Sequence, residues 1–220
     1  MGSTTSYNRF WIAGTDTDVG KTLVSALMVH GLQASYWKPI QSGILDGTDT
    51  DFVKNLTGLK KDHFIPEVYK FKQPLSPHLA ARLDGGEVHT DSIYAPDAAL
   101  IKNGTLVMEG AGGLLVPLND DTLMIDLMKQ IEAPVILVCR SSLGTINHSL
   151  LSIRVLKEYG FNILGFVMNG PENVENEKAV IKYGQIEHLG SIPQLKSLTR
   201  EVLTDVWNNL RIKDKISDIP

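Results

Sequence analysis

The stretch "WIAGTDTDVGKTLVSALMV", residues 11–29, joins a short apolar run to a segment of helical period through a glycine-containing turn. The turn runs from Gly14 to Gly20 and leads into Lys21 and Thr22. Glycines let backbone N–H groups converge on phosphate oxygens, and the start of a helix adds a partial positive charge. The stretch therefore predicts a phosphate-binding loop, although five residues rather than the usual four separate its two glycines.

In this interpretation the whole loop contacts a nucleotide. Lys21 reaches the terminal phosphates and the Thr22 hydroxyl ligates Mg²⁺. The alternative is a tight strand-to-helix turn that exposes the lysine. Two carboxylates in an anion-binding loop need a separate explanation. The expected nucleotide-binding residues of the loop are Gly14, Thr15, Asp16, Thr17, Asp18, Val19, Gly20, Lys21 and Thr22.

Composition limits the class of protein. A chain of 220 residues can bury a substantial core, and we expect a single domain, residues 1–220. With 43% hydrophobic and 21% charged residues it is typical of a globular protein, and we expect no membrane span. The net charge of −4 and the short basic runs argue against nucleic acid as a partner. The single cysteine, Cys139, and the lack of an apolar leader favour a cytoplasmic location.

Short apolar runs alternate with segments of helical period, which is typical of an α/β fold with a mostly parallel sheet flanked by helices, as in P-loop NTPases. Ligands of such folds lie beyond the carboxyl ends of the strands. The expected strands are 10–13, 35–38, 105–109, 135–139, 163–168 and 189–192. The expected helices are 21–32, 51–56, 77–83, 92–101, 124–130, 146–159, 174–183 and 198–210.

Charged residues follow several of these strands. Lys38 can hold a phosphate or a developing negative charge at the sheet edge, or it can be a surface lysine. Glu109 ends an apolar strand, where an acid is costly unless a cation pairs with it, so we expect it to ligate Mg²⁺. Among the acids of "DGTDTDF", helix N-capping suffices for Asp46 and Asp49, whereas Asp51 is either a cap or the second Mg²⁺ ligand.

Taken together, these segments resemble the dethiobiotin synthetase family. The matching pieces follow the family's order across nearly the whole chain. They are "GTDTDVGKT" (14–22), "KPIQSG" (38–43), "DTDFV" (49–53), "PLSPHLAA" (74–81), "VMEGAGGLLVPL" (107–118), "SLGTINHSLL" (142–151), "GFVMNG" (165–170) and "LGSIPQL" (189–195).

The resemblance implies an ATP- and Mg²⁺-dependent enzyme that converts 7,8-diaminopelargonic acid and CO₂ to dethiobiotin as a homodimer. It implies that Lys21 and Lys38 stabilise the transferring phosphoryl group and that Thr22, Asp51 and Glu109 hold Mg²⁺. It further implies that the substrate carboxylate meets Ser42 and, from the partner subunit, the helix start at Thr145 and Asn147. The remaining implied contacts are adenine at Asn169 and at 190–193, which includes Pro193, and a tyrosine contribution for which Tyr183 is the candidate.

This family's chemistry gives the loop acids a purpose. A free alkylamine is mostly protonated near neutrality, with a pKa of about 10.4 for a lysine-like amine. A carboxylate beside the phosphates can attract the diamine and accept its proton. We therefore expect a catalytic role for Asp18 and a bracing role for Asp16.

Two other functions are alternatives to a dethiobiotin synthetase. They are a partition-type switch ATPase and a corrinoid-type amidotransferase synthetase.

Overall fold

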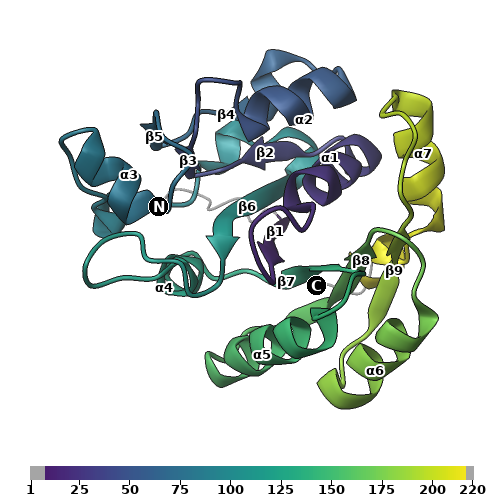
Figure 1. The fold of residues 1–220 in the computed structure, drawn as a ribbon. Coiled ribbons are helices and arrows are strands. Elements are labelled where there is room, and N and C mark those ends of the chain that lie inside the picture. The colour runs from purple at the N-terminus through teal and green to yellow at the C-terminus, as the bar shows by residue number, and fades with distance from the viewer. Residues whose placement is uncertain (1–7, 217–220) are drawn as a thin grey trace, which may run out of the picture.

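The computed structural model describes residues 8–216. Its main sheet has seven strands in the order β4-β2-β6-β1-β7-β8-β9, and all neighbouring strands are parallel (Figure 1). A second, two-stranded parallel sheet pairs β3 with β5. The predicted α/β fold with a parallel sheet is therefore confirmed. The strands are β1 (Asn8–Gly14), β2 (Ser35–Trp37), β3 (Ile40–Ser42), β4 (Phe64–Ile65), β5 (Tyr69–Phe71), β6 (Thr105–Gly113), β7 (Val135–Arg140), β8 (Ile163–Asn169) and β9 (His188–Ile192).

Helices cover both faces of the main sheet (Figure 1). Side chains alternate between the faces of a strand, so Phe10 and Ile12 of β1 pack with α1 and α7, whereas Trp11 and Ala13 pack with α4 and α5. None of the helices in residues 8–216 is long and apolar enough to cross a membrane. The helices are α1 (Lys21–Leu32), α2 (Asp49–Thr57), α3 (Pro77–Leu83), α4 (Met124–Gln130), α5 (Thr145–Glu158), α6 (Val174–Gly184), α7 (Arg200–Asn209) and α8 (Ile212–Ile216).

The packing of α7 against α1 depends on a glycine inside a helix. A Cβ atom at Gly31 would lie 2.1 Å from the indole of Trp207, which is 3% exposed. Gly31 therefore lets the two helices approach closely enough to bury that ring. The packing places the C-terminal helix beside the helix that follows the phosphate loop.

The structure differs from the sequence prediction in a few elements. The prediction of a helix at 92–101 is wrong, because only the short 3₁₀ turns Thr90–Ser92 and Ala98–Leu100 form there. Pro96 lies between those turns, and a proline removes a helical hydrogen bond and disfavours the α conformation of the residue before it. The strands β3, β4 and β5 were not predicted, since runs of two or three residues carry no readable period.

Candidate functional site

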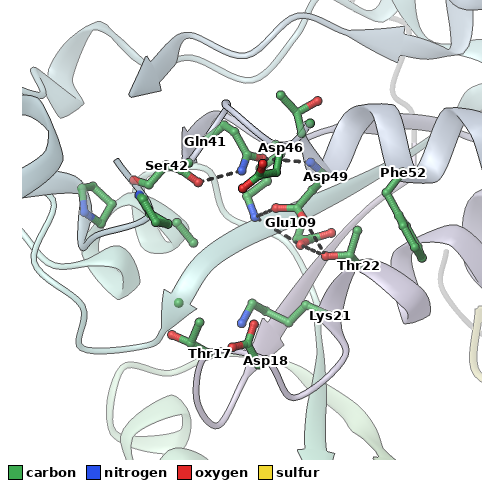
Figure 2. Close-up of a pocket in the computed structure, with 18 of the residues that line it drawn as sticks. Thr17, Asp18, Lys21, Thr22, Gln41, Ser42, Asp46, Asp49, Phe52 and Glu109 are labelled. Carbon is green, nitrogen blue, oxygen red and sulfur yellow. Dashed lines mark hydrogen bonds and ion pairs between the residues drawn. The ribbon is translucent and has the colours of Figure 1, made fainter. Parts of the chain in front are cut away.

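A cavity of about 900 Å³ opens at the carboxyl edge of the main sheet (Figure 2). Its walls come from the phosphate loop, the turn after β3, the start of α2, the segment before α3 and the residues that follow Glu109 in β6. These segments are far apart in sequence. The parallel sheet brings them together because its strands all end at the same edge.

The phosphate loop has the geometry that an anion site needs. The Thr15 N–H donates to the Val138 carbonyl over 3.0 Å, which ties the loop to β7. Gly20 has φ +99°, and a Cβ atom there would lie 2.2 Å from Nδ2 of Asn169. Glycine is therefore required both by the left-handed backbone and by the close approach of the asparagine.

Lys21 folds back over this loop. Its Nζ donates to the Asp16 carbonyl over 2.8 Å, and its side chain is buried. Burial lowers the pKa of Lys21 to about 8, because the attraction of Glu109 does not fully offset the loss of water and the repulsion of Lys38. Lys21 thus lines the cavity, and the hydrogen-bond partner of its Nζ among residues 8–216 is a backbone carbonyl.

The two loop acids point to different surroundings. Asp16 accepts from the Thr17 N–H over 2.8 Å and from Nη2 of Arg140 over 2.6 Å, so it braces the loop against the end of β7. Asp18 is exposed, adopts a left-handed backbone with φ +55° and lines the cavity next to Lys21 (Figure 2). Of the two, Asp18 lines this cavity and Asp16 does not.

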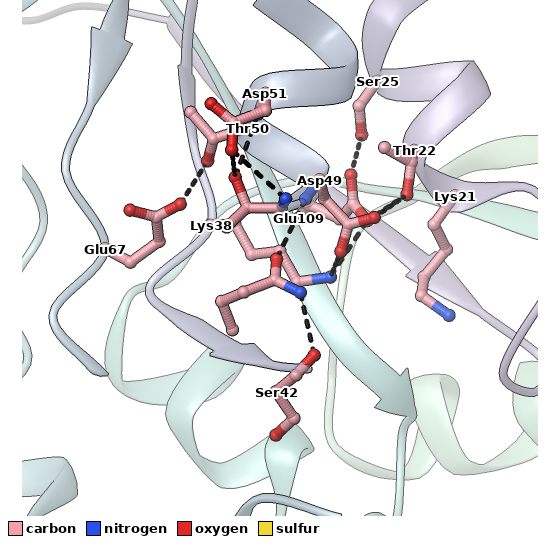
Figure 3. Close-up of polar contacts among 12 residues, drawn as sticks. Lys21, Thr22, Ser25, Lys38, Ser42, Asp49, Thr50, Asp51, Glu67 and Glu109 are labelled. Atoms are coloured by element: carbon pink, nitrogen blue, oxygen red, sulfur yellow. Dashed lines mark hydrogen bonds and ion pairs between the residues drawn. The ribbon is translucent and has the colours of Figure 1, made fainter. Parts of the chain in front are cut away.

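Glu109 is the centre of a buried polar network (Figure 3). Its Oε1 accepts from the Thr22 hydroxyl over 2.9 Å and from Nζ of Lys38 over 3.3 Å. Its Oε2 accepts from the hydroxyls of Ser25, over 2.8 Å, and Tyr36, over 2.9 Å. Burial, reinforced by the neighbouring Glu109, raises the pKa of Tyr36 well above its ordinary value, so the phenol remains a donor. Each carboxylate oxygen thus has two protein donors, and those of Oε1 are Thr22 and Lys38, which line the cavity.

Lys38 lies between two carboxylates. It forms ion pairs with Asp49 and, over 3.3 Å, with Glu109. Burial by itself lowers the pKa of Lys38, but the two acids outweigh it and raise the pKa above the ordinary value. Burial likewise favours a neutral Asp49, but Lys38 and the Thr22 hydroxyl lower the pKa of Asp49 below its usual range. Lys38 and Asp49 are therefore charged at neutral pH, and the burial of Lys38 excludes the surface-lysine interpretation.

The structure corrects the expected roles of two aspartates. Thr48, not Asp49, caps α2, and Asp51 completes the cap by accepting from the Thr48 hydroxyl over 2.7 Å and the Thr48 N–H over 3.2 Å. Asp51 is exposed, whereas Asp49 accepts from the Thr22 hydroxyl over 2.9 Å. Residues two apart on a helix point in nearly opposite directions, roughly 200° apart, so the two acids have different partners although both line the cavity. Asp49, rather than Asp51, thus contacts Thr22 and Lys38.

The chemistry of the donors suits a hard cation. Among residues 8–216 there is no cluster of three His, Cys, Asp or Glu side chains at metal-binding distance. Asp49, Glu109 and the Thr22 hydroxyl nevertheless offer carboxylate and hydroxyl oxygens at one point. Mg²⁺ prefers oxygen ligands, keeps several waters and uses one or two carboxylates together with substrate phosphates. The residues present therefore fit Mg²⁺ in a nucleotide complex.

The expected substrate-binding residues fall into two places. Ser42 lines the cavity, and its hydroxyl oxygen is out of solvent with no hydrogen-bond partner in the described chain. Thr145 and Asn147 at the start of α5 are not among the cavity's lining residues. Thr145 is buried, 3.3 Å from the Ser149 hydroxyl, whereas Asn147 is exposed.

The expected adenine residues also lie outside the cavity lining. Asn169 ends β8, and its Nδ2 donates to the Val19 carbonyl of the phosphate loop over 3.0 Å. Pro193 follows β9 and is exposed. Tyr183 on α6 is 65% exposed, with Nζ of Lys182 5.2 Å from its ring centre. Asn169 thus joins the phosphate loop to the edge where β8 and β9 end.

Several residues of the site were missed by reasoning from sequence. Ser25, Tyr36 and Gln41 carry no motif of their own and are recognisable only from their contacts. The role of Asp49 had a readable signal, because Thr48 followed three residues later by Asp51 is a capping pattern that leaves Asp49 free.

Comparisons with known proteins agree with this geometry. A family model described as "AAA domain" matches residues 8–202. ATP-dependent dethiobiotin synthetase BioD of Afipia carboxidovorans is 46% identical over 195 residues, or 89% of this chain and 91% of the relative. BioD of Agrobacterium fabrum is 44% identical over 89% of this chain and 90% of its own length. The chain belongs to the dethiobiotin synthetase family. Dethiobiotin synthetases are ATP-dependent ligases of biotin biosynthesis, so the expected family and class of activity are confirmed.

Solved structures outside the dethiobiotin synthetases share the fold. A plasmid partition protein of Borrelia burgdorferi superposes with a TM-score of 0.55 at 11% identity, covering 98% of this chain and 100% of that one. The cell division ATPase MinD of Pyrococcus furiosus gives a TM-score of 0.51 at 15% identity, covering 94% of this chain and 98% of its own. At such low identity these likenesses concern the fold alone.

Proposed function

We propose that this dethiobiotin synthetase carboxylates 7,8-diaminopelargonic acid with CO₂ and closes the ureido ring, converting ATP to ADP and phosphate in the presence of Mg²⁺. The observation that carries the proposal is the charged group at the centre of the cavity. Lys38 is buried between Asp49 and Glu109, and both acids lie 2.9 Å from the hydroxyl of Thr22 at the end of the phosphate loop, which can donate to either of them. Charge is thus concentrated where a terminal phosphate would react.

The nucleotide would bind along the phosphate loop. Its phosphates would meet the backbone N–H groups from Gly14 to Thr22, and Lys21 would exchange the Asp16 carbonyl for a phosphate oxygen. Adenine would lie beyond β8 and β9, at Asn169 and Pro193. The bond from Asn169 to the loop supports this, because within residues 8–216 it uses one amide N–H and leaves the other N–H and the amide oxygen for a ligand.

Thr22, Asp49 and Glu109 would hold Mg²⁺, with Asp49 in place of Asp51. When bound there, the ion would neutralise charge on the phosphates. Ser25 and Tyr36, which do not line the cavity, donate to Oε2 of Glu109, so this residue would offer the metal Oε1, on the side of Thr22 and Lys38. Their hydroxyls fix the carboxylate before any ligand arrives.

The proposed reaction proceeds in balanced steps. One amine adds to CO₂ and loses a proton to give a carbamate, and a carbamate oxygen attacks the γ-phosphorus as ADP leaves. The second amine attacks the carbonyl carbon of the resulting anhydride, loses a proton and expels phosphate. Asp18 would attract the diamine and accept a proton. Lys21 and Lys38 would stabilise the charge that develops on the transferring phosphoryl oxygens.

The far end of the substrate would meet Ser42, whose unpaired hydroxyl suits a carboxylate. The proposal includes a homodimer in which Thr145 and Asn147 of one subunit reach the substrate of the other. It is supported by exposed apolar side chains around α5, namely Leu115 (52% exposed), Leu143 (101%) and Leu151 (56%). We also propose a cytoplasmic location, which fits an ATP-consuming enzyme with a free cysteine.

The test is phosphate release from ATP with Mg²⁺ and bicarbonate, in the presence and absence of 7,8-diaminopelargonic acid, with dethiobiotin measured by mass spectrometry. We expect one phosphate per dethiobiotin, and release only with the diamine. Hydrolysis that is independent of the diamine and yields no dethiobiotin would refute the proposal and favour a switch ATPase.

A further inference from the structure

Gln41 joins two parts of the cavity, and none of the roles above uses it. It lies in β3, and its side chain is 5% exposed. Its Oε1 accepts from the backbone N–H of Asp49 over 3.2 Å, while its Nε2 donates to the backbone carbonyl of Ser42 over 2.9 Å (Figure 2). One amide therefore contacts both the turn that follows β3 and the first residue of α2.

The two ends of this bridge belong to different subsites. Asp49 contacts Thr22 and Lys38 and so lies on the metal and phosphate side. Ser42 carries the unpaired hydroxyl at the proposed carboxylate end of the substrate. The bridge needs a side chain with both a donor and an acceptor, because one end accepts a hydrogen bond and the other donates one. Among neutral side chains of this length, only glutamine has both.

The chain between the two subsites does little to set their separation. Residues 43–48 form a connection without helix or strand, in which Leu45 is 73% exposed. Gly43 and Gly47 both have positive φ, at +76° and +101°. Glycines leave a backbone many conformations, so a contact across the connection is needed to hold its ends in one arrangement.

We propose that Gln41 is a positioning residue that couples the carboxylate end of the substrate site to the Mg²⁺–nucleotide side. The inference rests on the proposed function, since Ser42 and Asp49 receive their ligands there. Gln41 acts through the two backbone groups that it holds and does not contact the reacting atoms. Its loss would let the turn and the start of α2 move independently, and each ligand would then have to order its own half of the cavity.

The expected effect follows from the value of single hydrogen bonds. A typical intramolecular hydrogen bond corresponds to roughly a 2- to 12-fold change in an equilibrium constant. Replacing Gln41 with methionine keeps the length of the side chain and removes both bonds. We expect binding of the diamine, and separately binding of a non-hydrolysable ATP analogue with Mg²⁺, each to weaken by a factor in that range. The factor by which one ligand strengthens the binding of the other should fall toward one.

Gln130→Met is a matched control. The amide of Gln130 also makes two bonds to backbone carbonyls, over 3.0 Å to Thr90 and 2.8 Å to Ile93, but Gln130 does not line the cavity. This variant also loses two hydrogen bonds. It should leave both binding constants within about twofold of the unmodified protein's, because Gln130 contacts neither subsite of the cavity.

Calorimetric titration of each ligand, alone and in the presence of the other, tests the proposal. Weakening of both ligands and loss of their coupling in Gln41→Met, but not in Gln130→Met, would support it. Unchanged binding, or weakening of one ligand only, would overturn it. If Gln41→Met does not fold, Gln41→Asn takes its place, because an amide one methylene shorter cannot reach both backbone groups. Failure of the unmodified protein to make dethiobiotin would overturn the proposed function instead, so the two failures are distinguishable.

Discussion

Asp49→Asn and Asp51→Asn form a pair that separates a metal ligand from a helix cap. The two residues lie two positions apart in the first turn of α2 and carry the same charge. Asp49 contacts Thr22 and Lys38, whereas the side chain of Asp51, within residues 8–216, makes its hydrogen bonds to Thr48. The same chemical change should therefore have two different outcomes.

For Asp49→Asn, the magnitude follows from what the carboxylate does. Loss of a group that supports a metal ligand typically costs about 10- to 100-fold in metal affinity, so loss of a direct ligand should cost at least about tenfold. The variant also loses hydrogen bonds to a charged group, worth about 1.5–3 kcal/mol of unfolding free energy. We expect the lower end of that range, because Lys38 keeps Glu109 as a partner at 3.3 Å.

For Asp51→Asn, we expect the protein to lose the stability that one negative charge contributes in the first turn of a helix. Such a charge contributes about 0.3–1 kcal/mol, and an asparagine can still accept from the Thr48 backbone. The Mg²⁺ requirement should stay within about twofold of the unmodified protein's, since no direct ligand is lost.

The assay is dethiobiotin formation titrated with Mg²⁺ at saturating ATP and diamine, together with the thermal midpoint of each variant. A large rise in half-saturating Mg²⁺ for Asp49→Asn, with none for Asp51→Asn, is the expected result. The opposite pattern would refute the assignment of Asp49 and restore Asp51 as the ligand.

Four further predictions concern other residues. Asp18→Asn should slow dethiobiotin formation while the binding of an ATP analogue persists, and unchanged turnover would remove Asp18 from the mechanism. Gly20→Ala should weaken nucleotide binding and destabilise the protein by about 1–3 kcal/mol, because φ is +99° and the new Cβ would approach Asn169 to 2.2 Å; a calorimetric titration and a thermal melt measure both. Lys21 has a lowered pKa of about 8, so its charge is present below that pH and is lost above it; nucleotide affinity should fall as pH rises through 8, and Lys21→Arg should abolish the fall. Burial raises the pKa of the Cys139 thiol to about 12, so a thiol reagent at pH 8 should label the protein only after denaturation, and rapid labelling of the folded protein would contradict its burial.

The sequence predicted the main architecture because the signals involved are local. Hydrophobic period and the glycine turn at 14–20 located the main strands and the phosphate loop within a few residues. The same reasoning predicted a helix at 92–101 that does not form, because Pro96 prevents a continuous helix there. Short strands such as β4 depend on pairing with β2, which is a contact made across the fold and has no local signal.

By itself, the sequence determined the parallel α/β fold, the phosphate loop with Lys21 and Thr22, and the family. Only the tertiary structure decided which side chains meet at the carboxyl edge of the sheet. It brought Asp49 rather than Asp51 into contact with Thr22 and Lys38, because α2 begins at the Thr48 cap and Asp51 turns back to that cap. It also brought Tyr36 to Glu109 from a neighbouring strand. Spacing along the chain fixes neighbours on one element, whereas contacts between elements depend on strand order and on where each helix starts.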